Sequence, residues 1–444
     1  MKKIMLALVL ILLIAGIGAP IFNGMMIERV VKNAVDNINT HYADTGADIA
    51  LRIVQYDRNF LSSKIQWEIC TGALGRVYGI ENIVLIERAK HGILGITSTT
   101  SLEKNKWFST VVENELEGKN PLDIQTRYNV LGNIKSSLTL DGFSIKERAG
   151  LVDVLPAHFF IQSDKEVKNL ILKGNWEGII APGKIKLAGI SLDSTQDKIT
   201  PYIWQGKTSI SADHISLDNG QKLIEIEGFT SDTTVAYDKK TNSISLEMAP
   251  GITRIKFQGN TGRDLFVRLG INKVDAQGYE EIVKIYSRAV NDTIKSIGSQ
   301  QPAEDMADSI KGMMEQQISR TAPQLIPACE KLLKKGLEIK IADLRAQLPQ
   351  GKIKADISLS LKQDMTMIQF IPIALQPSAA LNIFSLKSDI SIPHRLTGDN
   401  PNLLSPVYPG MQTGLFLKIK DNLIHSAETR EGKLFVNGQQ VRFN

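Results

Sequence analysis

Residues that could carry chemistry are scattered along this chain. The six histidines are widely separated: His41, His91, His158, His214, His394 and His425. None of them belongs to a His-Glu-x-x-His segment, the arrangement with which a helix holds zinc beside a general base. His214 lies in an alternating segment, where a structural role is expected. The histidine pattern therefore gives no metalloprotease signal.

Other catalytic motifs are also missing. There is no Gly-x-Ser-x-Gly elbow, no Cys-x-x-Cys pair and no dinucleotide glycine fingerprint. The segment Gly206-Lys207-Thr208 ends like a phosphate loop, but Pro201 stands where that motif has glycine. Carboxylates are plentiful, and a catalytic pair on distant strands cannot be recognised from sequence. We therefore predict a non-catalytic protein without a metal or cofactor, and the alternative is an envelope hydrolase whose site lies on loops.

The two cysteines, Cys70 and Cys329, leave two interpretations open. In an oxidising compartment they could form a disulfide. Equally, they could be two separate thiols that behave as small hydrophobic side chains. The sequence does not decide between them.

The N-terminus predicts a membrane anchor. Lys2 and Lys3 precede an uncharged apolar stretch from Ile4 to Phe22. As a helix these residues would be roughly 28 Å long, close to the thickness of a hydrocarbon core. The positive-inside rule keeps the lysines in the cytoplasm and places the rest outside. We predict a single-pass inner-membrane protein with a periplasmic body.

A cleaved signal peptide is the alternative for the same segment. Gly16 and Gly18 could occupy the positions before a cleavage site, whereas Pro20 disfavours cleavage nearby. We favour the uncleaved anchor, and both interpretations export the remainder.

The composition of the chain limits which classes of protein it can belong to. The chain has 444 residues and a formal net charge of +5, without a dense basic run, so nucleic-acid binding has no support. Its charged and hydrophobic contents are those of a folded protein.

Strand signals dominate residues 49–274, after a helical juxtamembrane segment at 25–48. Short segments with period-two alternation are separated by turn residues, which is typical of antiparallel strands. Two stretches inside this region suggest a weak hairpin repeat. Trp176 precedes Ile190-Ser191-Leu192-Asp193, and Trp204 precedes Ile215-Ser216-Leu217-Asp218.

Residues 275–336 form a predicted helical insert. An apolar stripe from Tyr279 to Ile297 indicates a first helix, and Pro302 suits the start of a second. Pro323 and Pro327 stand near the start of a third, which Gly336 should end. The second helix carries a candidate apolar surface made of Met306, Ile310, Met313 and Met314.

Residues 337–444 return to strands. Ile353 to Leu361 alternates strictly after the turn Pro349-Gln350-Gly351, and we expect Ile357 in the core and Ser358 at the surface. Near the end, Asn437-Gly438 is the favoured pair for a type I′ hairpin.

Several of these features resemble the YdgA-like family of bacterial envelope proteins of unknown function. Members have an N-terminal membrane segment followed by a Tyr-x-Arg-Gly-x-Phe-x-Ser-like motif. The corresponding stretch here contains Tyr56, Arg58, Phe60 and Ser62, and Asn59 replaces the family's glycine. The segments at Trp176 and Trp204 and the ending with Asn437 and Gly438 also look like this family. The resemblance implies an anchored periplasmic protein and supplies no activity; we interpret the motif residues as structural.

Together these signals predict a mainly β (α+β) protein. An N-terminal transmembrane helix (1–24) precedes a large, twisted antiparallel sheet with a helical layer. The predicted function is cell-envelope maintenance or assembly, through an apolar lipid-binding groove or an envelope protein partner. The oligomeric state stays open.

Overall fold

The structure is a computed structural model. It describes the backbone of residues 2–45, 47–72, 82–104, 112–114, 116–147, 150–181, 183–218, 223–298, 306–369, 377–396, 410–411 and 413–442. Side chains are described for the same residues except 2–20, 41, 45, 147, 294, 297, 298, 306–316 and 318.

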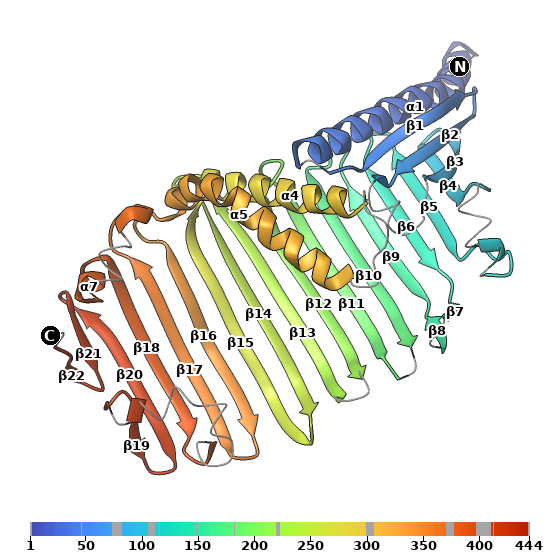
Figure 1. Cartoon of the computed structure of the whole chain (residues 1–444). Coiled ribbons are helices and arrows are strands. Elements are labelled where there is room, and N and C mark those ends of the chain that lie inside the picture. The colour runs from blue at the N-terminus through green and yellow to red at the C-terminus, as the bar shows by residue number, and fades with distance from the viewer. Residues whose placement is uncertain are drawn as a thin grey trace. The chain divides into compact units, whose positions relative to one another are not determined.

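A large antiparallel sheet of 22 strands accounts for most of the described residues, which confirms the mainly β prediction (Figure 1). The first ten strands are β1 (Ala50–Arg58), β2 (Ser62–Cys70), β3 (Ile83–Gly92), β4 (Gly95–Leu102), β5 (Leu122–Asn129), β6 (Ile134–Leu140), β7 (Phe143–Glu147), β8 (Gly150–Val154), β9 (Ala157–Ser163) and β10 (Asn169–Ala181). The middle strands are β11 (Ile185–Lys198), β12 (Trp204–Asp218), β13 (Leu223–Asp238), β14 (Ser243–Phe257), β15 (Asn260–Asp275), β16 (Glu338–Leu348) and β17 (Gly351–Leu361). The last are β18 (Phe384–Pro393), β19 (Leu417–Ile419), β20 (Asn422–Arg430), β21 (Lys433–Val436) and β22 (Gln439–Gln440).

The helices are fewer. They are α1 (Lys2–Thr45), α4 (Ala276–Gly298), α5 (Met306–Leu332), η2 (Met367–Gln369), η3 (Pro377–Ala379) and α7 (Ala380–Ile383). The chain divides into two compact units. The first comprises 1–181, 192–204 and 283–322, and the second comprises 182–191, 205–282 and 323–444.

Helix α1 packs on one face of β1 to β5 in the first unit. Residues on these strands alternate between buried and exposed, so that Ile65, Ala89, Ile96 and Tyr128 point toward α1. They enclose Ile27 and Val31 of the helix in the core of this unit. The juxtamembrane segment is therefore a packed helix, and its amphipathic spacing explains why.

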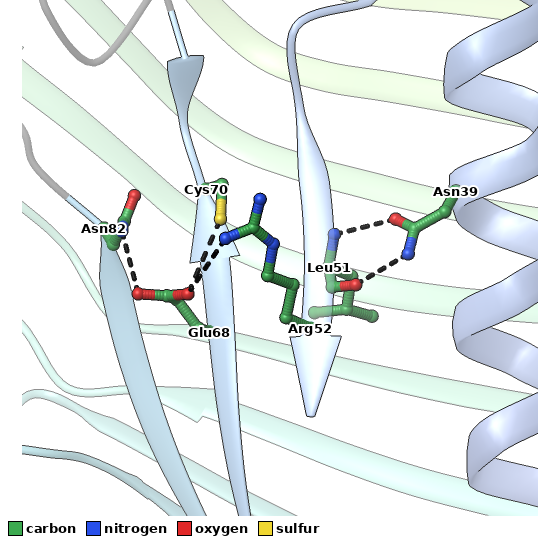
Figure 2. A network of polar contacts seen from close by, with 6 residues as sticks. All are labelled: Asn39, Leu51, Arg52, Glu68, Cys70 and Asn82. Atoms are coloured by element: carbon green, nitrogen blue, oxygen red, sulfur yellow. Dashed lines mark hydrogen bonds and ion pairs between the residues drawn. The ribbon is translucent and has the colours of Figure 1, made fainter. Parts of the chain in front are cut away.

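Two polar clamps fix the direction of α1. Asn23 Nδ2 donates to the carbonyl of Gly92, at the end of β3, over 2.7 Å. At the other end, the Asn39 side chain bonds both Leu51 N–H (2.9 Å) and Leu51 C=O (2.8 Å), as Figure 2 shows. Helix α1 therefore runs from the end of β3 toward the start of β1, and its earlier residues continue past the β3–β4 turn.

The predicted membrane segment lies mostly outside the described side chains. Backbone residues from Lys2 onward belong to α1, but side chains before Ile21 are not described. Among the described residues, no helix is long and apolar enough to cross a membrane. The membrane anchor at Ile4 to Phe22 stays a prediction.

The helical insert is present, but it contains two long helices instead of the three that were predicted. Helix α5 passes through Pro323 and Pro327 without interruption up to Leu332, so the predicted third helix is wrong. The start of α4 packs on the end of α5 in the second unit. There Glu281 pairs with Lys331, and Gly278 lets the two helices approach closely.

The predicted hairpin repeat is also wrong. Trp176 lies in the second half of β10 and Asp193 lies inside β11, on the next strand. Trp204, by contrast, begins β12, and Asp218 ends the same strand. The two stretches therefore occupy unlike positions, and their similarity is local sequence only.

The predicted C-terminal strand and the Asn437-Gly438 turn agree with the structure. The expected turn at Pro349-Gln350-Gly351 joins β16 to β17 in a hairpin, and β17 spans the predicted alternation. Asn437 and Gly438 both have positive φ, 50° and 80°, as a type I′ turn requires. Strands β21 and β22 pair across them.

Candidate functional site

A row of apolar side chains crosses six strands of the second unit. Each residue in the row is the direct antiparallel partner of the next, from β13 to β18. The row consists of Val235, Leu246, Ile271, Ile339, Leu359 and Leu386. Strand pairing thus brings together residues that are up to about 150 positions apart.

A second row lies beside the first on the same face, because side chains two residues apart on a strand share a face. Met248, Leu269, Ile341 and Ile357 are its direct partners across β14 to β17. We call the two rows together the apolar face.

The apolar face is open. Ile339 is 51% exposed and Ile271 is 37% exposed, and Met248, Leu269 and Leu359 are exposed to a similar degree. Within the second unit, these side chains are therefore accessible to solvent. Contiguous exposed aliphatic side chains are unusual in soluble proteins and mark sites of interaction.

The opposite face of the same strands is polar. Between the two apolar rows, the pairing row reads Glu247, Gly270, Lys340, Ser358 and Lys387. This part of the sheet is thus amphipathic, with an apolar and a charged side. The apolar face offers van der Waals contact and removal of water, so it suits an acyl chain or another apolar ligand.

Ile357 needs a correction. It lies on the apolar face, as the alternation predicted, but it is half-buried, and so is Ser358. Alternation shows which residues share a face, but it does not show whether another layer covers that face. The expected core position is therefore wrong.

A Ser–His pair, which would favour a hydrolase, occurs in the first unit. Ser63 Oγ and His91 Nε2 are 2.8 Å apart. Ser63 is 3% exposed and His91 6%, because α1 covers both, and the His91 ring lies directly against Gly24. Among the described residues, no carboxylate is bonded to His91. A substrate could reach Ser63 only if α1 left the sheet.

A buried carboxylate lies on the same face. Glu87 accepts hydrogen bonds from Ser98 Oγ (2.6 Å), Trp67 Nε1 (3.0 Å) and Tyr128 OH (3.2 Å). Burial, reinforced by the Glu87 charge, raises the pKa of Tyr128 well above its ordinary value. Three donors satisfy the carboxylate, so the arrangement fits a structural hydrogen-bond network.

The family-like motif lies where α1 meets the sheet. Tyr56 packs on the core beneath α1, and Arg58 forms an ion pair with Glu28 of α1 at 2.9 Å. Phe60 is exposed in the β1–β2 turn, and Ser62 begins β2. Tyr56 and Arg58 thus hold the helix in place.

The remaining predicted residues do not converge on this motif. Trp176 donates to the Leu155 carbonyl over 3.0 Å, and Trp204 lies beneath the Lys198 ammonium. Asn437 and Gly438 form the terminal turn. The side chains of Met306, Ile310, Met313 and Met314, in the first turns of α5, lie outside the described residues.

Both cysteines are free thiols in this structure. Cys70 Sγ lies 3.7 Å from Glu68, which also contacts Arg52 and Asn82 (Figure 2). Burial chiefly raises the pKa of the Cys70 thiol, and the Glu68 charge adds to this effect. The thiol is therefore less acidic than an ordinary cysteine, which disfavours a nucleophilic role.

Sequence patterns could not reveal the apolar face, because it depends on the pairing of six strands. The Ser63–His91 pair was equally hidden, since 28 residues separate its members. Residue spacing within one strand predicts a face, but contacts between strands require the register.

Comparison with known proteins places the chain in a family. No curated protein and no solved structure matches it. One family model, described as a bacterial protein of unknown function (DUF945), matches residues 1–443. The chain therefore belongs to this bacterial family of unknown function.

Proposed function

We propose that this protein is a membrane-anchored, exported protein that binds acyl chains or similar apolar ligands on the apolar face, in envelope maintenance or assembly. The observation that carries the proposal is the uninterrupted apolar row from Val235 to Leu386, open along its middle. Burying such side chains against a ligand gains roughly 25 cal/mol per Å² of apolar area.

The N-terminal sequence supports the location. The uncharged stretch from Ile4 to Phe22 follows two lysines, which orients a membrane helix with its body outside the cytoplasm. The similarity to YdgA-like envelope proteins points the same way. An inner-membrane protein with a periplasmic body would meet lipids directly.

A non-catalytic role fits the polar groups that the structure describes. The Ser63–His91 pair is closed by α1, and the Glu87 carboxylate is saturated with donors. The apolar face itself presents no acid, base or nucleophile. We therefore infer binding rather than turnover.

The test is to purify the full chain from membranes and to measure retained lipid by mass spectrometry. Ile339→Asn places an amide in the middle of the apolar face, where it would disrupt contact with an acyl chain. Lys340→Asn introduces the same side chain one residue later, on the polar face, and is the matched control.

We expect Ile339→Asn to lose most of the retained lipid and Lys340→Asn to keep it, with both variants folded by circular dichroism. Equal retention by the two variants would show that lipid binds elsewhere. A wild-type protein without any lipid would refute the proposal and favour a scaffold role.

A further inference from the structure

Three hairpin turns at one end of the first unit carry exposed apolar pairs. They are Phe60-Leu61 between β1 and β2, Ile93-Leu94 between β3 and β4, and Val130-Leu131 between β5 and β6. Leu94 is 85% exposed and Leu131 70% exposed. Turn positions normally carry polar residues, glycine or proline, so three apolar tips at one end require an explanation.

Helix α1 passes the same end. Asn23 bonds the carbonyl of Gly92, directly before Ile93, so the helix leaves the sheet beside this turn. Ile21, Phe22 and Met25 are exposed there, and the apolar stretch that begins at Ile4 precedes them. The tips and the exposed helix residues thus lie at one level.

Positively charged side chains lie on the strands next to these three turns. Lys90, Thr97, Arg127 and Lys135 are direct partners in one row across β3 to β6, on the face away from α1. Among the described residues, none of the three cations in this row, Lys90, Arg127 and Lys135, forms an ion pair. Like charges directly opposite one another destabilise a sheet, so an external anion would relieve the repulsion between Arg127 and Lys135.

A pocket of about 870 Å³ joins the two features. Its wall includes Ile93, Leu94 and Ile96 from one hairpin, and Arg127 and Lys135 from the next. Apolar and cationic groups therefore share one cavity. This combination matches an anionic phospholipid, which has a phosphate beside acyl chains.

We propose that the tips Phe60, Leu61, Ile93, Leu94, Val130 and Leu131 form a membrane-seating surface, which rests in the bilayer interface around the anchor. In this arrangement Arg127 and Lys135 bind the headgroup of an anionic phospholipid in the pocket. This inference rests on the proposed anchoring by Ile4 to Phe22, and it is independent of ligand binding on the apolar face. Seating would hold the first unit against the membrane in a fixed orientation.

The experiment uses the full chain in lipid nanodiscs, with Cys70→Ser and Cys329→Ser as background. Single cysteines replace Leu94, Leu131 or Leu151 and carry a fluorophore that spin-labelled lipid quenches near the headgroup. Leu151 is the control, because it is an exposed leucine of the β7–β8 hairpin, which follows the opposite end of β6. We expect strong quenching at positions 94 and 131 and little at position 151.

The headgroup is tested with Arg127→Glu combined with Lys135→Glu, against Lys146→Glu of β7 as the control. A cation near an anionic membrane surface changes the ratio of seated to free protein about fivefold. We expect quenching at position 94 to be stronger with phosphatidylglycerol than with phosphatidylcholine alone. The double variant should remove this difference, and Lys146→Glu should preserve it.

Three results would overturn the proposal. Quenching at either tip that is no stronger than at position 151 would refute seating while leaving the anchor intact. Protection of the tips from aqueous iodide without lipid quenching would indicate a protein partner or a second copy. Failure of the chain to enter nanodiscs at all would refute the anchor, and the seating with it.

Discussion

The imidazole of His91 lies so close to Gly24 that a Cβ at position 24 would stand 2.6 Å from Cε1 of the ring. This approach lets α1 sit directly on the sheet, and the bond between His91 and Ser63 holds the ring in place. Close contact between a helix glycine and a buried histidine is thus one of the features that fix α1 to the first unit.

Gly24→Ala should therefore loosen α1. Alanine favours a helix by about 1 kcal/mol over glycine, but the clash would push the His91 ring off Ser63. Overpacking of this kind typically costs about 1–3 kcal/mol, so we expect a lower midpoint in urea unfolding. Asn33→Ala, on the exposed side of α1, should leave the midpoint unchanged or raise it. Unchanged stability in Gly24→Ala would mean that the ring moves freely.

Acid should weaken the same contact. Burial chiefly lowers the pKa of His91, and the charge of Arg58 adds to this effect. The unfolded chain takes up the proton near pH 6.5, whereas the folded protein takes it up only at lower pH. Stability is therefore fully present above about pH 6.5 and is lost as the pH falls through the folded pKa.

This dependence can be measured as the urea midpoint at about pH 7.5 and about pH 5. His91→Gln keeps a polar partner for Ser63 but does not titrate, so its midpoint should fall less than that of the wild-type protein. An equal fall in both proteins would assign the effect to other groups.

Glu87→Gln should destabilise the first unit. The carboxylate accepts three hydrogen bonds, whereas the amide of glutamine has one acceptor oxygen, and its NH2 group would replace an oxygen that now accepts from Ser98 and Tyr128 or from Trp67. An unsatisfied buried group costs about 1–3 kcal/mol. Asp123→Asn is a comparable change at an exposed position of β5 and should cost much less. Thermal unfolding of the two variants gives the comparison, and equal melting temperatures would contradict the buried network.

The predicted orientation has a direct test. A reporter that is active only in the periplasm, fused after Asn444, should be active, because Lys2 and Lys3 keep the N-terminus in the cytoplasm. Replacing both lysines with glutamate should reduce this activity. A cytoplasm-specific reporter that is active at the same position would refute the orientation.

The strands were largely predictable, because alternation and turn residues act locally. Ile353 to Leu361 and the Asn437-Gly438 turn are examples in which neighbouring residues determine the structure. Whether a face is covered depends on distant segments, which is why Ile357 was placed wrongly. Distant contacts also explain why α5 continues through Pro323 and Pro327. Each proline removes one helical hydrogen bond, but tertiary packing can stabilise the helix around it.

The candidate sites were harder to predict than the strands. The apolar face needs the register of six strands, and the membrane-seating surface needs three turns to lie at one end of a sheet. Single residues such as Leu94 and Leu131 look unremarkable in sequence, since isolated exposed leucines are common. They indicate a membrane-seating surface only because the turns that carry them lie at the same end of the sheet.

Asn39 has a consequence for how copies of this chain can associate. Strand β1 pairs with β2 from Ala50–Cys70 to Arg58–Ser63, so a further strand could be added to β1 only along its other side. The Asn39 amide takes the hydrogen bonds of Leu51 that an added strand would need, and it does so from a helix, which cannot propagate the ladder. The side chain thus acts as a chain terminator for sheet growth: polymerisation through this edge would first require α1 to be released.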